Sequence, residues 1–197
     1  MPRPPKHRQP IIDASVTLFR RHGYGATGLN DIVESSGAPK GSLYHYFPGG
    51  KPSIAVAAVE EAGRRVAATL EALADETDST GALLRAHARL LTRWMAKSGF
   101  RDGCPMTTVL LELTPETHAV NEAGKAAYDL RIRLLKQKLR ADGFSEERAA
   151  RLASLCTSAL QGALIEARVR RSGKPLAVAA EELSGMLEHL AVIEATR

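Results

Sequence analysis

Apolar side chains recur every three or four residues along almost the whole chain, and no stretch alternates apolar with polar residues as a half-buried strand would. Near the N-terminus, for example, Ile12, Val16 and Phe19 fall on one face of a helix. No longer segment of the sequence repeats itself. This spacing predicts an all-α fold of about nine helices.

Prolines, glycines and capping residues divide the pattern into helices. Pro10 suits the start of a helix, Gly23 its end, and Gly37 the positive φ of a tight turn. Thr114 and Ser145 are predicted to be N-caps of later helices. The predicted helices cover about 10–22, 29–36, 39–47, 52–74, 80–97, 104–113, 115–141, 145–171 and 175–195.

The first quarter of the chain differs in composition from the rest. Residues 1–51 hold seven Lys or Arg against three Asp or Glu, so they carry +4 of the chain's net charge of +5. Five of the nine aromatic residues also lie there. We therefore expect a small basic domain at 1–51 and a helical domain at 52–197.

Several function classes find no support in the sequence. No apolar run approaches the roughly 20 residues of a membrane span, and the basic N-terminus lacks the apolar segment of a secretory signal, so we expect a cytoplasmic protein. The motif GYGATG at 23–28 fits a dinucleotide fingerprint, but a helical pattern precedes it instead of a strand. The histidines lack zinc-pair spacing and no catalytic triad motif is present. We expect no enzyme activity, no cofactor and no metal.

Cys104, in the stretch DGCPM, has two readings: a reactive thiolate at a helix N-terminus, or a buried structural cysteine. Free cysteines are among the most buried residues, which favours the structural reading.

The stretch GAPKGSLYHYFPGGK at 37–51 is the most informative segment. Two short helices separated by a glycine turn, inside a basic three-helix unit, form the helix-turn-helix pattern that enters a DNA major groove. Leu43 and Phe47 can hold the second helix against Ile32. The candidate DNA-binding residues lie on its other face and at the edges: Thr27, Lys40, Gly41, Ser42, Tyr44, His45, Tyr46 and Lys51.

These residues suit different contacts. Lys40 can reach a guanine edge or a phosphate, and the tyrosines can contact phosphates or thymine methyl groups. Gly41 permits close approach of the backbone, while Thr27 and Lys51 could hold phosphates. A basic arm could be formed by Arg3, Lys6 and Arg8.

Residues 10–51, above all YGATGLNDIVESSGAPKGSLYHYFPGGK, resemble the N-terminal domain of TetR-family transcriptional regulators. Gly28 replaces a usual hydroxyl residue, and FPGGK is one residue longer than the common link. FPGGK together with GCPM at 103–106 resembles the LmrA and YxaF subgroup.

The resemblance implies a homodimer built from the last two helices and an effector pocket in the middle helices. Intramolecular packing alone could also explain the apolar stripes of the last two helices. The candidate dimer-interface residues are Leu152, Cys156, Ala159, Ala163, Ala167, Ala180, Leu183, Leu187 and Leu190. The candidate effector-binding residues are Leu91, Trp94, Met95, Phe100, Met106, Leu110 and Tyr128, which favour a small apolar or aromatic effector.

We therefore expect a repressor that binds double-stranded palindromic operator DNA as a dimer and has no membrane partner. Effector binding is expected to shift the linking helix at 52–74 and so weaken DNA binding. Two alternatives are a nonspecific architectural DNA-binding protein, and a helical enzyme or ligand carrier whose N-terminal head binds DNA only nonspecifically.

Overall fold

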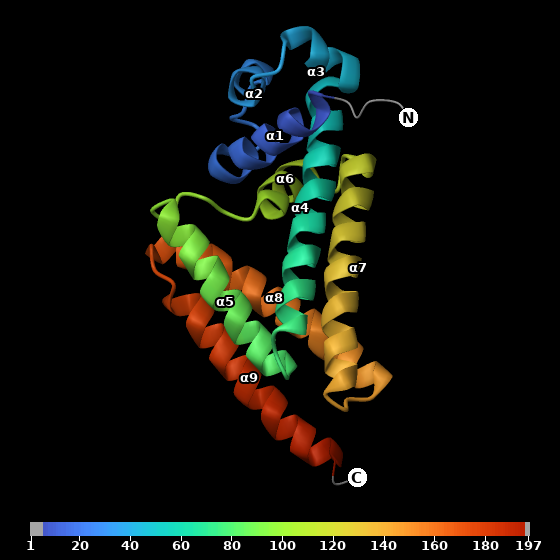
Figure 1. Cartoon of the computed structure of the whole chain (residues 1–197), viewed down its shortest axis with the longest axis vertical. Coiled ribbons are helices and arrows are strands. Elements are labelled where there is room, and N and C mark those ends of the chain that lie inside the picture. The colour runs from blue at the N-terminus through green and yellow to red at the C-terminus, as the bar shows by residue number, and fades with distance from the viewer. Residues whose placement is uncertain (1–5, 196–197) are drawn as a thin grey trace. The chain divides into compact units, whose positions relative to one another are not determined.

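The computed structural model describes residues 6–195, which form nine α-helices and no strand (Figure 1). The predicted all-α fold is confirmed. The helices are α1 (Arg8–His22), α2 (Leu29–Ser36), α3 (Lys40–Tyr46), α4 (Gly50–Asp75), α5 (Thr80–Lys97), α6 (Pro105–Leu113), α7 (His118–Ala141), α8 (Glu146–Arg170) and α9 (Lys174–Ala195).

The helices group into two compact units that are not contiguous in sequence. The first contains the described residues up to Arg64 together with Cys104–Ala127, and the second contains Arg65–Gly103 together with the described residues from Tyr128 onward. Helices α4 and α7 contribute residues to both units. The units therefore differ from the expected domains at 1–51 and 52–197, because α6 and the start of α7 belong with the first helices.

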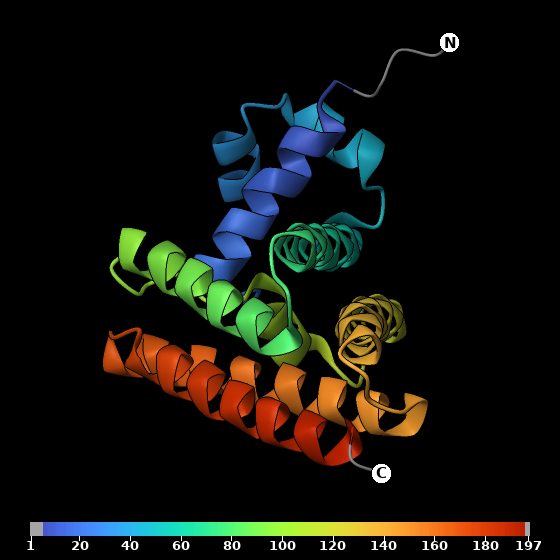
Figure 2. The ribbon, with the colours of Figure 1, turned by 60° about the horizontal axis from the view of Figure 1, so that its bottom comes forward.

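The core of the first unit forms around α1, which lies against α2, α3 and α6. Figure 2 shows α1 running past α2 and α3. Its side chains Ile11, Ile12 and Phe19 are fully buried. Because Ile11 and Ile12 are adjacent and Phe19 follows them by eight and seven positions, the three lie on one face of the helix. The opposite face is partly exposed along the middle of the helix and exposed at its two ends.

In the second unit, α5 packs mainly against α9, and α8 also packs against α9. The three helices lie side by side in both ribbon views (Figures 1 and 2). A Cβ added to Gly81 would lie 2.3 Å from Ser184 Oγ, so glycine allows α5 to approach α9 closely. This contact brings the middle of the chain against its C-terminal helix.

Some helix ends differ from the sequence prediction. The N-cap assignment of Thr114 is wrong: Thr114 ends α6, its Oγ1 donates to Leu110 O at 2.7 Å, and α7 begins only at His118. A hydroxyl can hydrogen-bond the carbonyl one turn earlier as readily as it caps a following helix. Helix α1 begins two residues before Pro10, which the first turn tolerates because its N–H groups lack intrahelical partners. The Ser145 cap and the positive φ of Gly37 are confirmed.

Candidate nucleic-acid interface

Helix α3 has one buried and one exposed face. Leu43 is fully buried and Phe47, just after the helix, is 3 % exposed, as the sequence predicted. The side chain of Tyr44 is 49 % exposed, and Lys40 and His45 are also exposed. A helix anchored in this way presents its cationic and aromatic side chains outward.

The predicted DNA-binding residues differ in exposure. Lys40, Gly41, Tyr44 and His45 are exposed; Ser42, Tyr46 and Lys51 are partly exposed; and Thr27 is buried. No atom lies within 4 Å of a Cβ added to Gly41, so the backbone at this position is open to close approach. The rings of His45 and Tyr46 meet edge to face with centroids 4.9 Å apart. The structure therefore brings most of the predicted residues onto one surface.

Thr27 is the exception because it lies inside the turn between α1 and α2. Its Oγ1 donates to Gly23 O at 2.8 Å, and its backbone N–H donates to Tyr24 O at 3.2 Å. The side chain is 2 % exposed. In this structure Thr27 thus fixes the turn that leads into α2.

The same turn is held from α6 by a carboxylate that the sequence did not reveal. Glu112 Oε1 accepts from the backbone N–H of Tyr24 at 2.8 Å, and Oε2 accepts from that of Gly25 at 2.5 Å. Lys51 Nζ lies 3.4 Å from Gly25 O and 4.2 Å from the centroid of the Tyr24 ring. We call Tyr24, Gly25, Lys51 and Glu112 the turn clamp.

The electrostatics of the turn clamp follow from burial and from its carboxylate. Burial lowers the pKa of Lys51, and the negative charges of Glu112 and Asp31 oppose this shift. Burial also raises the pKa of Tyr24, and Glu112 raises it further. The carboxylate thus favours the cationic form of Lys51 and the neutral form of Tyr24. No motif could have indicated Glu112, which is 88 positions from Tyr24 in the chain.

The proposed basic arm is described only in part. Arg3 lies outside the described residues. Lys6 and Arg8 are exposed, and Arg8 Cζ stands 5.7 Å from the centroid of the Phe47 ring. A guanidinium at this distance from an aromatic face is attracted to it. Arg8 therefore starts α1 against the end of α3.

The predicted effector-binding residues are divided between the two units. Met106 and Leu110 belong to the first unit, where a Cβ on Gly124 would lie 2.5 Å from Leu110 Cδ2. The second unit contains Leu91, Trp94, Met95, Phe100 and Tyr128. Met95 is buried, whereas Trp94 is 45 % exposed.

A set of buried polar side chains in the second unit was missed by the sequence reasoning. His87 on α5, Arg131 on α7 and Thr157 on α8 are each no more than 5 % exposed. Arg131 Nη1 donates to Gln161 Oε1 at 3.1 Å. We call His87, Arg131, Thr157 and Gln161 the polar cluster. Its only signal in the sequence is polar residues at helix positions where apolar ones recur.

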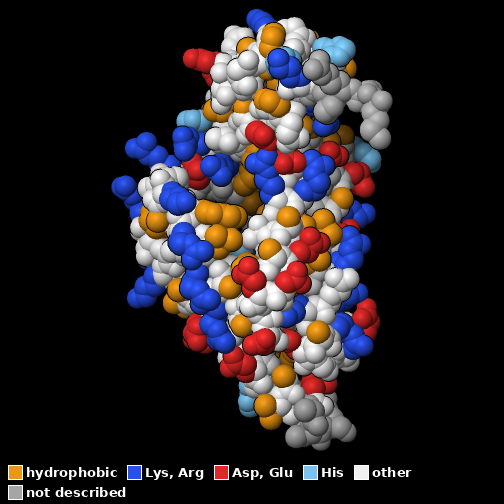
Figure 3. Space-filling model, viewed as in Figure 1, with side chains coloured by type: hydrophobic (Ala, Val, Ile, Leu, Met, Phe, Trp, Pro, Cys, Tyr) orange, Lys and Arg blue, Asp and Glu red, His pale blue; other side chains and the backbone are white. Residues whose placement is uncertain are grey.

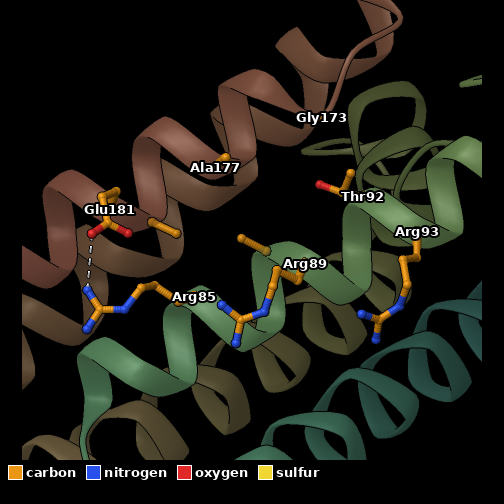
Figure 4. Close-up of a pocket in the computed structure, with 9 residues that line it drawn as sticks. Arg85, Arg89, Thr92, Arg93, Gly173, Ala177 and Glu181 are labelled. Atoms are coloured by element: carbon orange, nitrogen blue, oxygen red, sulfur yellow. Dashed lines mark hydrogen bonds and ion pairs between the residues drawn. The ribbon is translucent and has the colours of Figure 1, made fainter.

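A groove of about 460 Å³ lies between α5 and α9 in the second unit (Figure 4). Arg85, Arg89 and Arg93 project from successive turns of α5 along it, and Arg85 Nη1 is 3.5 Å from Glu181 Oε1. Ala177 on α9 lies on the opposite wall. None of the predicted effector-binding residues lines this groove.

Most predicted dimer-interface residues are buried within the single chain. These are Leu152, Cys156, Ala163, Ala167, Ala180, Leu183 and Leu187, while Ala159 and Leu190 are partly exposed. Packing of α8 and α9 on each other and of α9 on α5 accounts for this burial. The large exposed apolar side chains of the same two helices are Leu155, Ile165, Val169, Val178, Val192 and Ile193.

No group of three or more His, Cys, Asp and Glu side chains could hold a metal ion in residues 6–195. In the same range, no helix has both the length and the apolar character needed to span a membrane.

Two family models match the chain. Residues 11–58 match the model of bacterial regulatory proteins of the tetR family, and residues 80–182 match the C-terminal domain of LmrA/YxaF-like transcriptional regulators. The first match contains the helix-turn-helix, and the second covers most of α5 to α9. Both resemblances noted in the sequence are confirmed.

Individual proteins agree with these matches. The HTH-type transcriptional regulator Rv0196 of Mycobacterium tuberculosis is 36 % identical over 91 % of this chain and 93 % of its own length. LmrA of Bacillus subtilis, also an HTH-type transcriptional regulator, is 32 % identical over 86 % of this chain and 90 % of its own length. The fold is similar to that of a cysteine variant of the TetR-family regulator CifR, which was solved with 26-base-pair operator DNA. The TM-score is 0.73, and the two proteins are 22 % identical over 93 % of this chain and 98 % of the CifR chain.

Replacing Glu112 with Gln is expected to loosen the turn clamp. The carboxylate accepts from Tyr24 and Gly25 with separate oxygens, whereas the amide has an NH2 group in place of one oxygen and so sets a donor against one of the two backbone N–H donors. Hydrogen exchange at one or both of these backbone amides should be at least about fivefold faster, measured by NMR. Glu116→Gln, at an exposed position of the first unit, is the matched control. Unchanged exchange at both amides would show that the carboxylate does not hold the turn.

His87 is expected to make the protein less stable in acid. Burial and the charge of Arg131 lower its pKa from 6.5 to about 3. Between these pH values the unfolded chain binds more protons than the folded chain, so stability falls as the pH drops below 6.5, by up to about 1.4 kcal/mol per pH unit. Urea unfolding between pH 7 and pH 5 measures this slope. His87→Leu should flatten it, whereas His118→Gln, at an exposed site, should not; equal slopes in all three proteins would contradict the assignment.

Proposed function

Because this chain belongs to the TetR family of bacterial transcriptional regulators, we propose that it is a repressor that binds a palindromic operator as a homodimer. A small effector with an apolar or aromatic body releases it from the DNA. Binding to operator DNA places the protein in the cytoplasm. The family consists of regulators and not of enzymes, so the enzyme alternative has no support.

The exposed face of α3 is the observation that carries this proposal. Lys40, Tyr44 and His45 project from a helix whose other face is buried, and Gly41 leaves the backbone open. A recognition helix needs this division, because its inner face fixes its orientation while its outer face meets the base edges and phosphates. The related CifR variant was solved with operator DNA.

The side chains of this face suit both kinds of DNA contact. Lys40 can donate to the acceptors of a guanine or to a phosphate. Tyr44 and Tyr46 can donate to phosphates, and their rings can pack on thymine methyl groups. Lys51 stands beside the turn clamp, where it can meet a phosphate at the edge of the interface. Thr27, whose hydroxyl is used inside the turn, supports the interface without touching DNA.

Dimerisation is proposed through the exposed apolar side chains of α8 and α9. Val178 and Val192 on α9 are fourteen residues apart, and Gly185 lies midway, at the seven-residue spacing of a helix-pairing seam. On α8, Leu155 and Ile165 flank Gly162. An added Cβ at either glycine would meet nothing within 4 Å in the single chain, so a second chain could approach closely there.

A groove between the end of α8 and the start of α9 supports the same interface. It has a volume of about 450 Å³ and includes Ala159, Ala163, Val178 and Ala179. Small side chains let a neighbouring helix come close, while Glu166 stands at the groove as a charged group. We propose that a helix of the second copy covers this groove, so that Ala159 is an interface residue and Ala163 forms its floor.

Release from DNA is proposed to pass through α4 and α6. Helix α4 contributes residues to both compact units without a break, so a displacement of one end can reach the other. Glu112 on α6 holds the turn before α2 through two hydrogen bonds. An effector that binds better to the DNA-free arrangement of these helices would lower the affinity for the operator.

Replacing Lys40 with Ala is expected to weaken operator binding. Loss of a contact to a base edge or phosphate should lower the affinity at least about fivefold. The measurement is a fluorescence anisotropy titration of DNA from upstream of the gene, at two salt concentrations. Scrambled DNA of the same length reports nonspecific binding, which depends more uniformly on phosphate charge.

Lys125→Ala is the matched control for this experiment, because it removes the same charge from an exposed position on α7. It should leave operator binding within about twofold of the wild type. Equal binding of operator and scrambled DNA by the wild type would support the nonspecific architectural protein instead. Equal operator affinity of the wild type and of Lys40→Ala would show that Lys40 makes no contact that contributes to binding.

Replacing Ile165 with Glu is expected to dissociate the dimer. The Ile165 side chain is 50 % exposed in the single chain, so a charge there costs little until a second copy would bury it. Sedimentation should show monomers. Operator affinity should fall at least about a hundredfold, because the two DNA-binding domains of a dimer no longer bind the operator together. Gln137→Glu adds a negative charge at an exposed position on α7 and should stay dimeric. If the Ile165→Glu protein stays dimeric, the dimer interface does not include Ile165.

A further inference from the structure

A row of cationic side chains follows one side of α5. Arg85, Arg89, Arg93 and Lys97 come at four-residue intervals, so each lies one helical turn beyond the last. Figure 3 shows Lys and Arg side chains gathered where α5 lies. Like charges at this spacing on a helix repel one another. The row is therefore unfavourable for α5 unless negative groups lie against it.

The chain itself supplies negative groups at one end of the row. Arg85 Nη2 lies 2.8 Å from Glu188 Oε1, and its Nη1 lies 3.5 Å from Glu181 Oε1. Arg89 and Arg93 are exposed, and neither forms a hydrogen bond or an ion pair with any residue in the part of the chain that the structure describes. Two guanidinium groups one helical turn apart thus lack an anion.

These two arginines line a groove. It is the groove of about 460 Å³ between α5 and α9, which we call the α5–α9 groove. Figure 4 shows the guanidinium groups of Arg85, Arg89 and Arg93 following one another along α5, with Ala177 on the facing helix. Its volume falls in the range of about 300–1,000 Å³ that is usual for small-molecule sites. The groove can therefore hold the body of a ligand as well as its charged group.

The two ends of the α5–α9 groove differ in charge. Glu181 lies at the end where it pairs with Arg85. At the other end, a Cβ added to Gly173 would lie 2.2 Å from Thr92 Cγ2, so the turn between α8 and α9 closes against α5 there. The wall between these ends includes Ala177 and is otherwise formed by small side chains of α9. The unpaired cations therefore face a wall that carries no charge of its own beyond Glu181.

The chemistry of the unpaired pair favours a phosphate monoester. A guanidinium group binds the oxygens of a phosphate through paired hydrogen bonds, and its flat face stacks on aromatic rings. A phosphate monoester carries a charge of about −1.5 to −2 near pH 7, so it can neutralise two neighbouring guanidinium groups. A phosphate diester or a carboxylate carries only a single charge. The small alanine side chains leave room for a flat apolar body beside the phosphate.

We propose that the α5–α9 groove binds a phosphate monoester with an apolar or aromatic body. The phosphate lies between Arg89 and Arg93 and accepts a hydrogen bond from the Thr92 hydroxyl, while the body packs on Ala88 and Ala177. None of the predicted effector-binding residues lines this groove, so it is a second site in addition to the proposed effector pocket. The inference does not rest on the proposed function, because binding is measured without DNA.

The test measures direct binding to the full-length protein. The probe is naphthyl phosphate, and the anisotropy of its fluorescence reports the bound fraction. Naphthol has the ring without the charge, naphthalene sulfonate has the ring with a single charge, and inorganic phosphate lacks the ring. Each of these compounds is titrated as a competitor. Naphthyl phosphate should bind at least about tenfold more tightly than any of them.

Arg89→Gln and Arg93→Gln test the position of the phosphate. Both side chains are exposed, so these changes leave the core intact. Each variant should bind naphthyl phosphate at least about fivefold more weakly, because a charged hydrogen-bond donor is lost. Naphthol affinity should change less than about twofold. The matched control is Arg133→Gln, which removes an exposed guanidinium group from α7 in the same unit and should change neither affinity.

Ala177→Glu tests the facing wall of the groove. A carboxylate at this exposed position repels a phosphate held across from it, so naphthyl phosphate should bind at least about fivefold more weakly. Ala68→Glu adds the same charge at an exposed position on α4 in the second unit and should keep the affinity within about twofold. Equal losses in these two variants would show that the phosphate does not lie in the groove.

Three further outcomes would overturn the inference. One is the absence of naphthyl phosphate binding, and another is binding that Arg89→Gln and Arg93→Gln weaken no more than Arg133→Gln does. The third concerns DNA, whose backbone phosphates are also anions. If Arg89→Gln and Arg93→Gln weaken binding to both operator and scrambled DNA more than Arg133→Gln does, the groove holds DNA instead of a small molecule. Failure of the wild type to prefer its operator would overturn the proposed function and leave this inference standing.

Discussion

The orientation of the exposed face of α3 depends on the burial of two side chains, Leu43 and Phe47. A helix of seven residues is too short to be stable alone, because the cost of its first turn is not recovered over so few hydrogen bonds. Burying each of these side chains contributes about 1.5–3 kcal/mol, which holds α3 against α1 and α2. The same burial fixes the direction of Lys40 and Tyr44. Stability and orientation of the interface therefore have one cause.

The turn before α2 shows how a distant element can support this surface. Its backbone N–H groups at Tyr24 and Gly25 bond to a carboxylate of α6, and Thr27 closes the turn from within. Hydrogen bonds to an ionised acceptor are about twice as strong as neutral ones. The entry into the helix-turn-helix is thus fixed by a residue far away in sequence. A movement of α6 that displaced Glu112 would disturb the turn before α2 through these two hydrogen bonds.

The second unit combines tight packing with unsatisfied polar atoms. Gly81 allows α5 and α9 to meet closely, whereas His87 and Thr157 leave buried atoms without partners. Each such atom costs about 1–3 kcal/mol relative to a paired one. Natural sequences break the rules of a satisfied core mainly at functional sites. His87 Nδ1 and Thr157 Oγ1 are therefore local exceptions within an otherwise closely packed unit.

The sequence by itself determined the all-α fold, the positions of most helices and the family, because apolar spacing, glycine turns and the segment from Gly37 to Lys51 are local signals. It also identified Leu43 and Phe47 as the inner face of α3. Tertiary structure alone decided that Thr27 is buried, that Glu112 holds the first turn and that His87 lies near the charge of Arg131. Likewise, it assigned the apolar stripes of α8 and α9 to packing within one chain and left other apolar side chains exposed. Such pairings join residues from helices far apart in the chain, and no local pattern encodes which helix faces meet.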